Sequence, residues 1–247
     1  MITHAAAMLA YDGSGIDGPL FTDITGFARH TPWLNDPIDL WTTPGLAVFA
    51  VLMVIGWWKA RRRGDRPMAL ALAVPVSVAV TFAVAEVIKK LVTEVRPCYS
   101  LPHDFFIEAC PVRTDYAFPS GHSTTAFATV AALWLLDRRL SAVAAVFAVF
   151  EGFTRVYVGA HYPHDVLGSA LLSLPVAYGV SRLLARPATR LVARLRTGAL
   201  RPLLAAREAG AHRPAPGPRG PLPGGRDPEA TGRRETSRRS RTHARQR

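Results

Sequence analysis

Long apolar runs alternate with short polar or charged segments through the middle of the chain. The five runs cover residues 40–58, 68–88, about 120–136, 140 to about 159, and 166–184. A helix needs about 20 apolar residues to cross the hydrocarbon core of a bilayer, and most of these runs reach that length. The pattern therefore predicts an all-α integral membrane protein, a helical bundle of about five transmembrane helices.

The regions on either side of these runs differ from the middle of the chain. Residues 1–38 mix Gly, Asp and Pro with apolar residues at helical spacing, such as Leu20 and Phe27. We expect an outward-facing segment that is a loop or holds an interfacial helix, and a sixth span if it inserts. Residues 39–185 form the predicted transmembrane domain. Residues 186–247 are predicted to be a basic cytoplasmic helix with a disordered Pro/Arg-rich tail.

Positive charge gathers at the C-terminal end of the chain. The net charge is +12, and from residue 182 onward 17 Arg stand against 4 acidic residues. This charge suits a tail beside the bilayer surface, so nucleic acid is not an expected partner. Basic residues also follow the first and third runs, at 59–66 and 138–139. By the positive-inside rule these segments are cytoplasmic, which places the protein in the plasma membrane with the 91–118 loop outside.

Residues that can carry chemistry gather at the outward ends of the apolar runs. They form three groups: Lys89 with Arg96-Pro97; Ser120-Gly121-His122; and Arg155, His161 and Asp165. We expect Lys89 and Arg96 to share one helix face, which Pro97 ends. Ser120 is a good helix N-cap, and the free N–H groups of a helix start bind anions. Fixed cations, a helix start and histidines together suit a phosphate ester site.

The order and spacing of these groups resemble the three-part signature of the type 2 phosphatidic acid phosphatase superfamily. The matching residues are Lys89-x6-Arg96-Pro97, Pro119-Ser120-Gly121-His122 and Arg155-x5-His161-x3-Asp165. The resemblance covers about residues 40–184, and its layout is most like the bacterial undecaprenyl-diphosphatase branch. The third motif usually opens with Ser-Arg, whereas here Thr154 precedes Arg155 and keeps the hydroxyl.

The resemblance implies a metal-independent lipid phosphatase without a cofactor. It implies that His161 attacks phosphorus to form a phosphohistidine, that Asp165 holds the other ring nitrogen, and that His122 protonates the leaving oxygen and then activates water. The implied phosphate-binding residues are Lys89, Arg96, Ser120, Gly121 and Arg155. His164 also neighbours Asp165, but the interval from Arg155 selects His161 as the nucleophile, so His164 is interpreted as supporting or exposed.

The implied substrate is a membrane lipid phosphate or diphosphate whose chain stays in the bilayer. Undecaprenyl diphosphate, recycled in cell-wall synthesis, is the first choice, with phosphatidylglycerophosphate and phosphatidic acid as alternatives. A lipid phosphotransferase shares every motif. Vanadate-dependent haloperoxidases resemble the same site, but they are soluble. A non-enzymatic lipid-binding or transport protein would keep the spans without needing His122, His161 and Asp165 together.

Cys98 and Cys110 flank the outward loop just after Pro97. Their spacing is not that of a CxxC metal site. In an oxidising compartment we favour a disulfide over two free thiols. Such a bond would close the loop and stiffen the chain beside Arg96.

Overall fold

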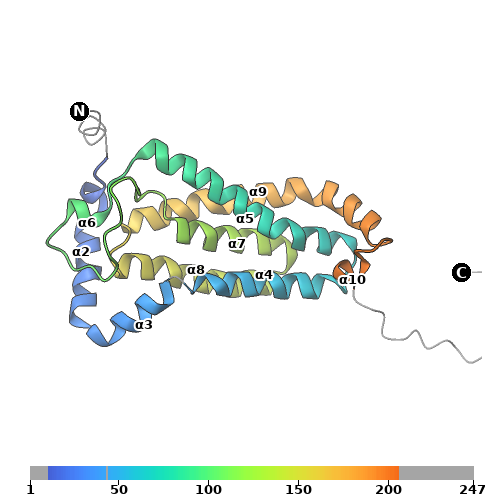
Figure 1. Ribbon diagram of the computed structural model, residues 1–247, viewed down its shortest axis with the longest axis horizontal. Helices are drawn as coiled ribbons and strands as arrows, with labels where there is room; N and C mark the ends of the chain where they lie inside the picture. The colour runs from blue at the N-terminus through green and yellow to red at the C-terminus, as the bar shows by residue number, and fades with distance from the viewer. Residues whose placement is uncertain (1–10, 43, 206–247) are drawn as a thin grey trace, which may run out of the picture. The chain divides into compact units, whose positions relative to one another are not determined.

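The computed structural model describes residues 11–42 and 44–205, which form helices joined by loops (Figure 1). The helices are α2 (Ser14–His30), α3 (Pro32–Thr42), α4 (Leu46–Ala60), α5 (Asp65–Val92), α6 (Pro97–Ser100), α7 (Gly121–Leu136), α8 (Arg138–Tyr157), α9 (Pro163–Leu195) and α10 (Arg201–Leu204). The five helices α4, α5, α7, α8 and α9 correspond to the five predicted apolar runs. The short α6 lies within the predicted polar loop.

Helix α7 occupies the centre of the bundle, where it contacts α4, α5, α8 and α9 (Figure 1). Its buried positions are mostly Ser, Thr and Ala, such as Ser123, Ala128 and Ala132. Small side chains let neighbouring helix backbones approach closely, which is how helices pack inside a membrane. This central packing places the first turn of α7 among the ends of the surrounding helices.

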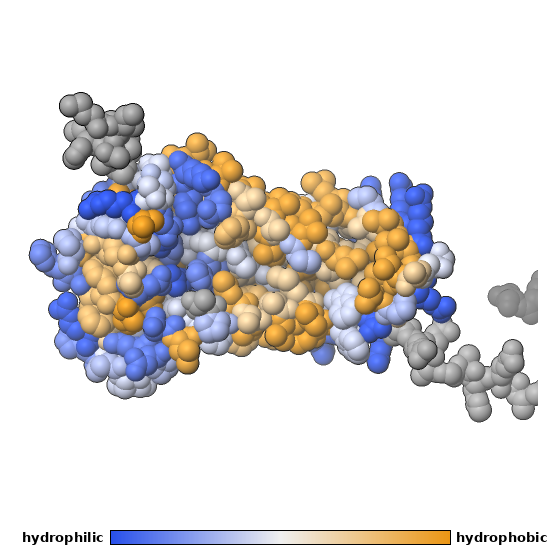
Figure 2. Space-filling model, in the orientation of Figure 1, coloured by the Kyte–Doolittle hydropathy of each residue, from blue (hydrophilic) through white to orange (hydrophobic). Residues whose placement is uncertain are grey.

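Apolar side chains also cover the outer faces of the helices. Val54 on α4, Val146 on α8 and Leu171 on α9 are all exposed, and Figure 2 shows an apolar band between two polar ends. Helices α5, α8 and α9 are each long and apolar enough to cross a membrane, whereas α3 and α4, bent by 46°, pass only as a pair. The predicted all-α membrane fold is confirmed. At 16 residues α7 is shorter than a typical span.

The first predicted span begins later than the apolar run suggested. The sequence predicted a helix over 40–58, but α4 begins at Leu46, after a break at Pro44 and Gly45. Proline has no N–H to donate to the helical hydrogen-bond ladder, which explains the break. Trp41 belongs to α3, and its Nε1 donates a hydrogen bond to Glu151 Oε2 on α8 at 3.0 Å.

The predicted boundary at residue 185 falls inside α9, which continues to Leu195. The predicted basic helix is thus the last part of a membrane helix. There Arg182, Arg186 and Arg190 line a hollow of about 480 Å³ together with Arg66 of α5. The predicted disordered tail lies almost wholly outside the described residues.

Candidate active site

The end of α5 positions Lys89 and Arg96 differently from the sequence prediction. Helix α5 ends at Val92, and Thr93 takes a left-handed conformation (φ 54°). Arg96 is extended, as expected for a residue before proline, so the two cations do not share a helix face. They converge instead on Asp115, whose carboxylate lies 2.9 Å from Arg96 Nη2 and 3.9 Å from Lys89 Nζ.

Ser120 caps α7 as predicted. Its Oγ accepts a hydrogen bond from the backbone N–H of Ser123 at 3.4 Å. Gly121 follows where space is short, because a Cβ there would lie 3.3 Å from the Phe82 ring. The His122 side chain forms no hydrogen bond with any residue that the structure describes. It therefore remains available to exchange a proton with a ligand.

His161 lies between α8 and α9, buried with Asp165 of the first turn of α9. Asp165 Oδ2 accepts the Tyr162 backbone N–H at 2.9 Å and lies 3.2 Å from His161 Nδ1. On the other side of the ring, Nε2 lies 2.9 Å from Arg96 Nη1. Because a guanidinium can only donate, Nε2 is the acceptor of this hydrogen bond. The proton of the neutral ring is therefore on Nδ1, which donates a hydrogen bond to Asp165 Oδ2.

This arrangement fixes the state of His161. Burial lowers its pKa well below the ordinary value, and the positive charges of Arg96 and Arg155 lower it further. The imidazole is thus neutral near pH 7, with the lone pair of Nε2 directed at the cation group. Nucleophilic attack on phosphorus requires a neutral imidazole, and the Nε2 lone pair becomes available when Arg96 releases it.

Two carboxylates of the 101–118 loop form ion pairs with the cations of the site. Glu108 lies 2.7 Å from Arg155, and Asp115 holds Arg96 and Lys89. The three cations are largely buried, whereas Asp115 and Glu108 are 41% and 36% exposed. The carboxylates therefore lie on the solvent side of the cations, where an incoming phosphate would meet them. Glu108 was not predicted from the sequence. The basic residues predicted at the outward ends of the helices could have indicated an acidic partner nearby.

Ser169 connects the second and third groups of predicted site residues. Its Oγ lies 3.0 Å from the carbonyl oxygen of Ser120 and 2.7 Å from that of Asp165. The carbonyl of Arg155 accepts the backbone N–H of His161 at 3.2 Å. The structure thus brings the predicted residues to one end of the bundle, where His161, Asp165 and Arg96 are in direct contact. Ser169 stands four residues after Asp165, a helical interval that could have indicated it.

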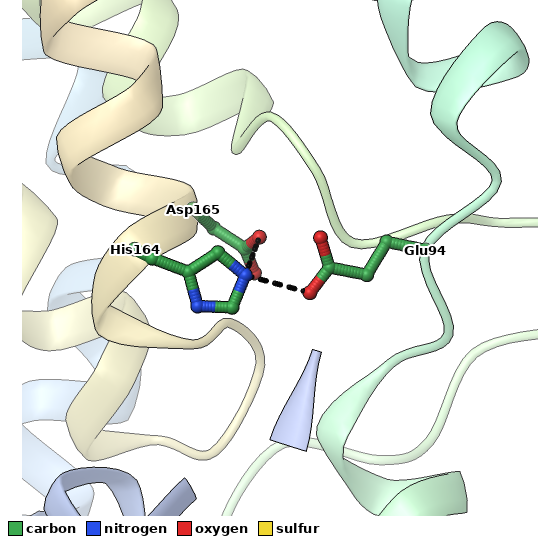
Figure 3. A group of neighbouring side chains, drawn as sticks. All are labelled: Glu94, His164 and Asp165. Carbon is green, nitrogen blue, oxygen red and sulfur yellow. Dashed lines mark hydrogen bonds and ion pairs between the residues drawn. The ribbon is translucent and has the colours of Figure 1, made fainter. Parts of the chain in front are cut away.

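His164 lies beside this group and contacts carboxylates at both ring nitrogens. Nδ1 is 2.7 Å from Asp17 Oδ1, and Nε2 is 2.8 Å from Glu94 Oε1. Figure 3 shows Glu94 approaching His164 and Asp165 from the opposite side. Ligand atoms of Glu94, His164 and Asp165 lie within 4.8 Å of one another, so these residues could hold a cation. Sequence reasoning did not anticipate either partner of His164.

The model of the PAP2 superfamily matches residues 70–187. Over these residues the chain is similar to the PAP2 superfamily. The match covers all three groups of predicted site residues.

Other proteins resemble this chain over most of its length. Undecaprenyl-diphosphatase BcrC of Bacillus subtilis is 28% identical over 182 residues, which are 71% of this chain and 89% of the relative. The putative undecaprenyl-diphosphatase YbjG of Escherichia coli is 28% identical over 159 residues, 63% of this chain and 76% of the relative. The crystal structure of a transmembrane PAP2 type phosphatidylglycerolphosphate phosphatase from Bacillus subtilis matches with a TM-score of 0.50 at 22% identity, covering 69% and 86% of the two chains. That structural likeness shows a shared fold.

A disulfide joins Cys98 to Cys110, with a Cα–Cα distance of 6.0 Å. It closes the segment between residues 98 and 110, which carries Glu108. Replacing both cysteines by serine should lower the free energy of unfolding by about 3 kcal/mol, because the unfolded chain regains the entropy of the open loop. Thermal unfolding in detergent measures the loss. Reductant should lower the parent's midpoint and leave the variant's unchanged; equal midpoints for the parent and the variant without reductant would contradict this role.

Proposed function

We propose that the protein is a membrane lipid phosphatase that releases phosphate from undecaprenyl diphosphate through a phosphohistidine intermediate. One observation carries the proposal: buried, neutral His161 is held by Asp165 at one nitrogen and presents the other to Arg96. The site stands at one end of an apolar band, so a polyprenyl chain can stay in the bilayer while its headgroup reaches the cations. The named undecaprenyl-diphosphatases among the relatives support this substrate.

In the first half of the proposed reaction, the lone pair of His161 Nε2 attacks the terminal phosphorus. The bond from phosphorus to the bridging oxygen breaks, and its electron pair leaves with undecaprenyl phosphate. His122, which takes up a proton once the bound diphosphate offsets the charge of the nearby cations, gives that proton to the leaving oxygen. In the second half, water attacks the phosphohistidine and gives its proton to His122. The nitrogen–phosphorus bond breaks, which releases inorganic phosphate and restores neutral His161.

The cations stabilise the charge that develops on the phosphoryl oxygens. Arg96 donates to Nε2 in the structure, so substrate phosphate must draw the guanidinium away before attack. The ion pairs of Asp115 and Glu108 with these cations must also break when the substrate phosphate binds. No step of this proposal needs a metal, so excess chelator should leave the rate of the purified protein unchanged, and a rate lost in chelator and restored by a divalent cation would exclude this mechanism.

Glu108→Gln should strengthen inhibition by inorganic phosphate. The substitution removes the carboxylate that competes for Arg155, and half-exposed ion pairs contribute up to about 1 kcal/mol, so we expect phosphate to bind about 2- to 5-fold more tightly. The inhibition constant of phosphate measures the change. Asp104→Asn is the matched control, because Asp104 lies in the same loop and accepts a hydrogen bond from Thr22 instead of a cation. Unchanged phosphate inhibition in Glu108→Gln would mean that Glu108 does not compete with phosphate.

Rates with three lipids test the substrate. Purified protein should release phosphate from undecaprenyl diphosphate faster than from phosphatidylglycerophosphate or phosphatidic acid. Analysis of radiolabelled products then separates hydrolysis from transfer, because a phosphotransferase would place the label on an acceptor lipid. Turnover of none of the three lipids would favour a lipid-binding or transport protein and would overturn the proposed function.

The proposed orientation places this site on the outer face of the plasma membrane and the C-terminal tail in the cytoplasm. It rests on the basic segments around Arg66, Arg139 and Arg182. A single cysteine introduced at exposed Val112, beside the site, should react with an impermeant maleimide on whole cells. Cysteine at Arg139 should react only after the cells are opened, and the reverse pattern would overturn the orientation.

A further inference from the structure

His164 connects three separate parts of the chain at the edge of the candidate active site. It belongs to the first turn of α9, directly before Asp165. Asp17 of α2 accepts both the backbone N–H of His164 at 2.7 Å and its ring Nδ1 at 2.7 Å. Glu94, from the segment after α5, lies 2.8 Å from ring Nε2. Asp17 stands at a kink in α2 (φ −142°, ψ 26°), which frees its carboxylate to cap α9.

Two aromatic rings also stack on the ring of His164. Tyr162 stacks on it at 5.4 Å between ring centroids, and Phe118 stacks at 6.4 Å. Glu94 is 1% exposed, and Gly13 covers the Glu94–His164 contact. A Cβ on Gly13 would lie 1.9 Å from Glu94 Oε1 and 2.9 Å from His164 Cε1. The contact between His164 and Glu94 therefore has a single well-defined geometry.

Hydrogen bonding at both ring nitrogens defines the charge of this cluster. Asp17 and Glu94 both offer carboxylate oxygens, which accept, so the contacts are satisfied when the ring carries a proton on each nitrogen. The resulting positive charge lies 3.7 Å from Asp165 Oδ1. That oxygen is buried and accepts no hydrogen bond from the described residues. Without His164, Asp165 and Glu94 would face one another as two buried carboxylates with no cation between them, a costly arrangement.

We propose that His164 is a positioning residue, which acts through Asp165 on the nucleophile and offsets the charge of Glu94. Asp165 can orient His161 Nδ1 only while its carboxylate is ionised and fixed in place. His164 secures both conditions, by its charge and by tying the start of α9 to α2 and to the segment that carries Arg96. This inference rests on the proposed function, because it assigns His164 to the phosphatase reaction.

Two substitutions that leave the proposed reacting groups intact test the role. His164→Gln should lower kcat about 10- to 100-fold, the scale seen for groups that orient a reacting ligand, while the inhibition constant of phosphate stays near the parent value. Adding Glu94→Gln should recover much of the loss, because it removes the uncompensated carboxylate. A double variant no faster than His164→Gln would refute the charge compensation, and parent-like kcat in His164→Gln would refute the positioning role.

Gly13→Ala provides a test that keeps every charged side chain. The added methyl group must displace Glu94 from His164, so kcat should fall about 10-fold with phosphate inhibition unchanged. Gly15→Ala is the matched control, because a Cβ there meets nothing within 4 Å, and it should behave as the parent. Thermal unfolding of both variants shows whether each is folded. Equal kcat in folded Gly13→Ala and Gly15→Ala would overturn the inference.

A spectroscopic readout separates this inference from the proposed function. In ¹⁵N-histidine spectra at pH 7, His164 should be doubly protonated and His161 should be the Nδ1–H tautomer; Gly13→Ala should lose that fixed tautomer and Gly15→Ala should keep it. A parent that shows these signals but turns over no lipid phosphate would support the positioning and refute the phosphatase. A His164 signal that shifts when Mg²⁺ or Ca²⁺ is added would identify a cation site instead and overturn the inference.

Discussion

His161→Ala should abolish phosphate release, lowering kcat for undecaprenyl diphosphate by about 10⁴-fold or more. Removing the nucleophile leaves only binding and charge stabilisation, and losses of this size follow removal of a reacting group in other enzymes. The lost ring also leaves Arg96 Nη1 without its contact to Nε2, so phosphate should still bind. Release of phosphate from purified protein in detergent or nanodiscs measures the effect.

The matched control for this prediction is His103→Ala. His103 is an exposed histidine of the 101–118 loop, and its side chain contacts none of the cations in the described part of the chain. Its rate should equal that of the parent. If His161→Ala, folded and able to bind phosphate, kept the parent rate, the assignment of His161 as nucleophile would be wrong.

Asp165→Asn should lower kcat by about 10³- to 10⁴-fold, with a smaller effect on substrate affinity. An amide at this position can donate to His161 Nδ1, which favours the tautomer whose proton sits on the attacking Nε2; the same change in hydrolytic triads has an effect of this order. Asp165 also accepts the Tyr162 N–H at the start of α9, so some stability should be lost as well. Steady-state kinetics with thermal unfolding separates the two effects.

Asp23→Asn provides the control, because Asp23 is an exposed acid of α2 remote from these contacts. It should leave both kcat and stability unchanged. A folded Asp165→Asn protein with parent kcat would show that the carboxylate does not set the tautomer of His161.

Much of the fold followed from the sequence because apolar runs report helices directly. The runs that form α5, α8 and α9 are long and apolar enough to predict membrane-spanning helices directly. The first span was misplaced at its start because Pro44 and Gly45 break a run that hydropathy alone treats as continuous. The Cys98–Cys110 disulfide could also be predicted, because the chain has two cysteines and they lie close together in the sequence.

The site was predictable as a set of residues but not as a set of contacts. Motif spacing identified His161 and Arg96, whose catalytic roles remain predictions for the experiments above. It missed the left-handed Thr93, which ends α5 before Arg96 and depends on local backbone geometry. It also missed Asp17, whose contact with His164 spans 147 residues of sequence. Loop carboxylates such as Glu108 follow no periodic pattern, so their pairing with buried cations appears only in three dimensions.

Direct trapping of the intermediate tests the central claim. Purified protein mixed with undecaprenyl diphosphate labelled in its terminal phosphate is quenched with alkali during turnover, because phosphohistidine is stable to base, and its peptides are examined by mass spectrometry. We predict phosphate on the peptide that contains His161. It should be absent from a blank without substrate and lost in His161→Ala. Steady phosphate release with no labelled histidine, or with label on His122 or His164, would contradict the account.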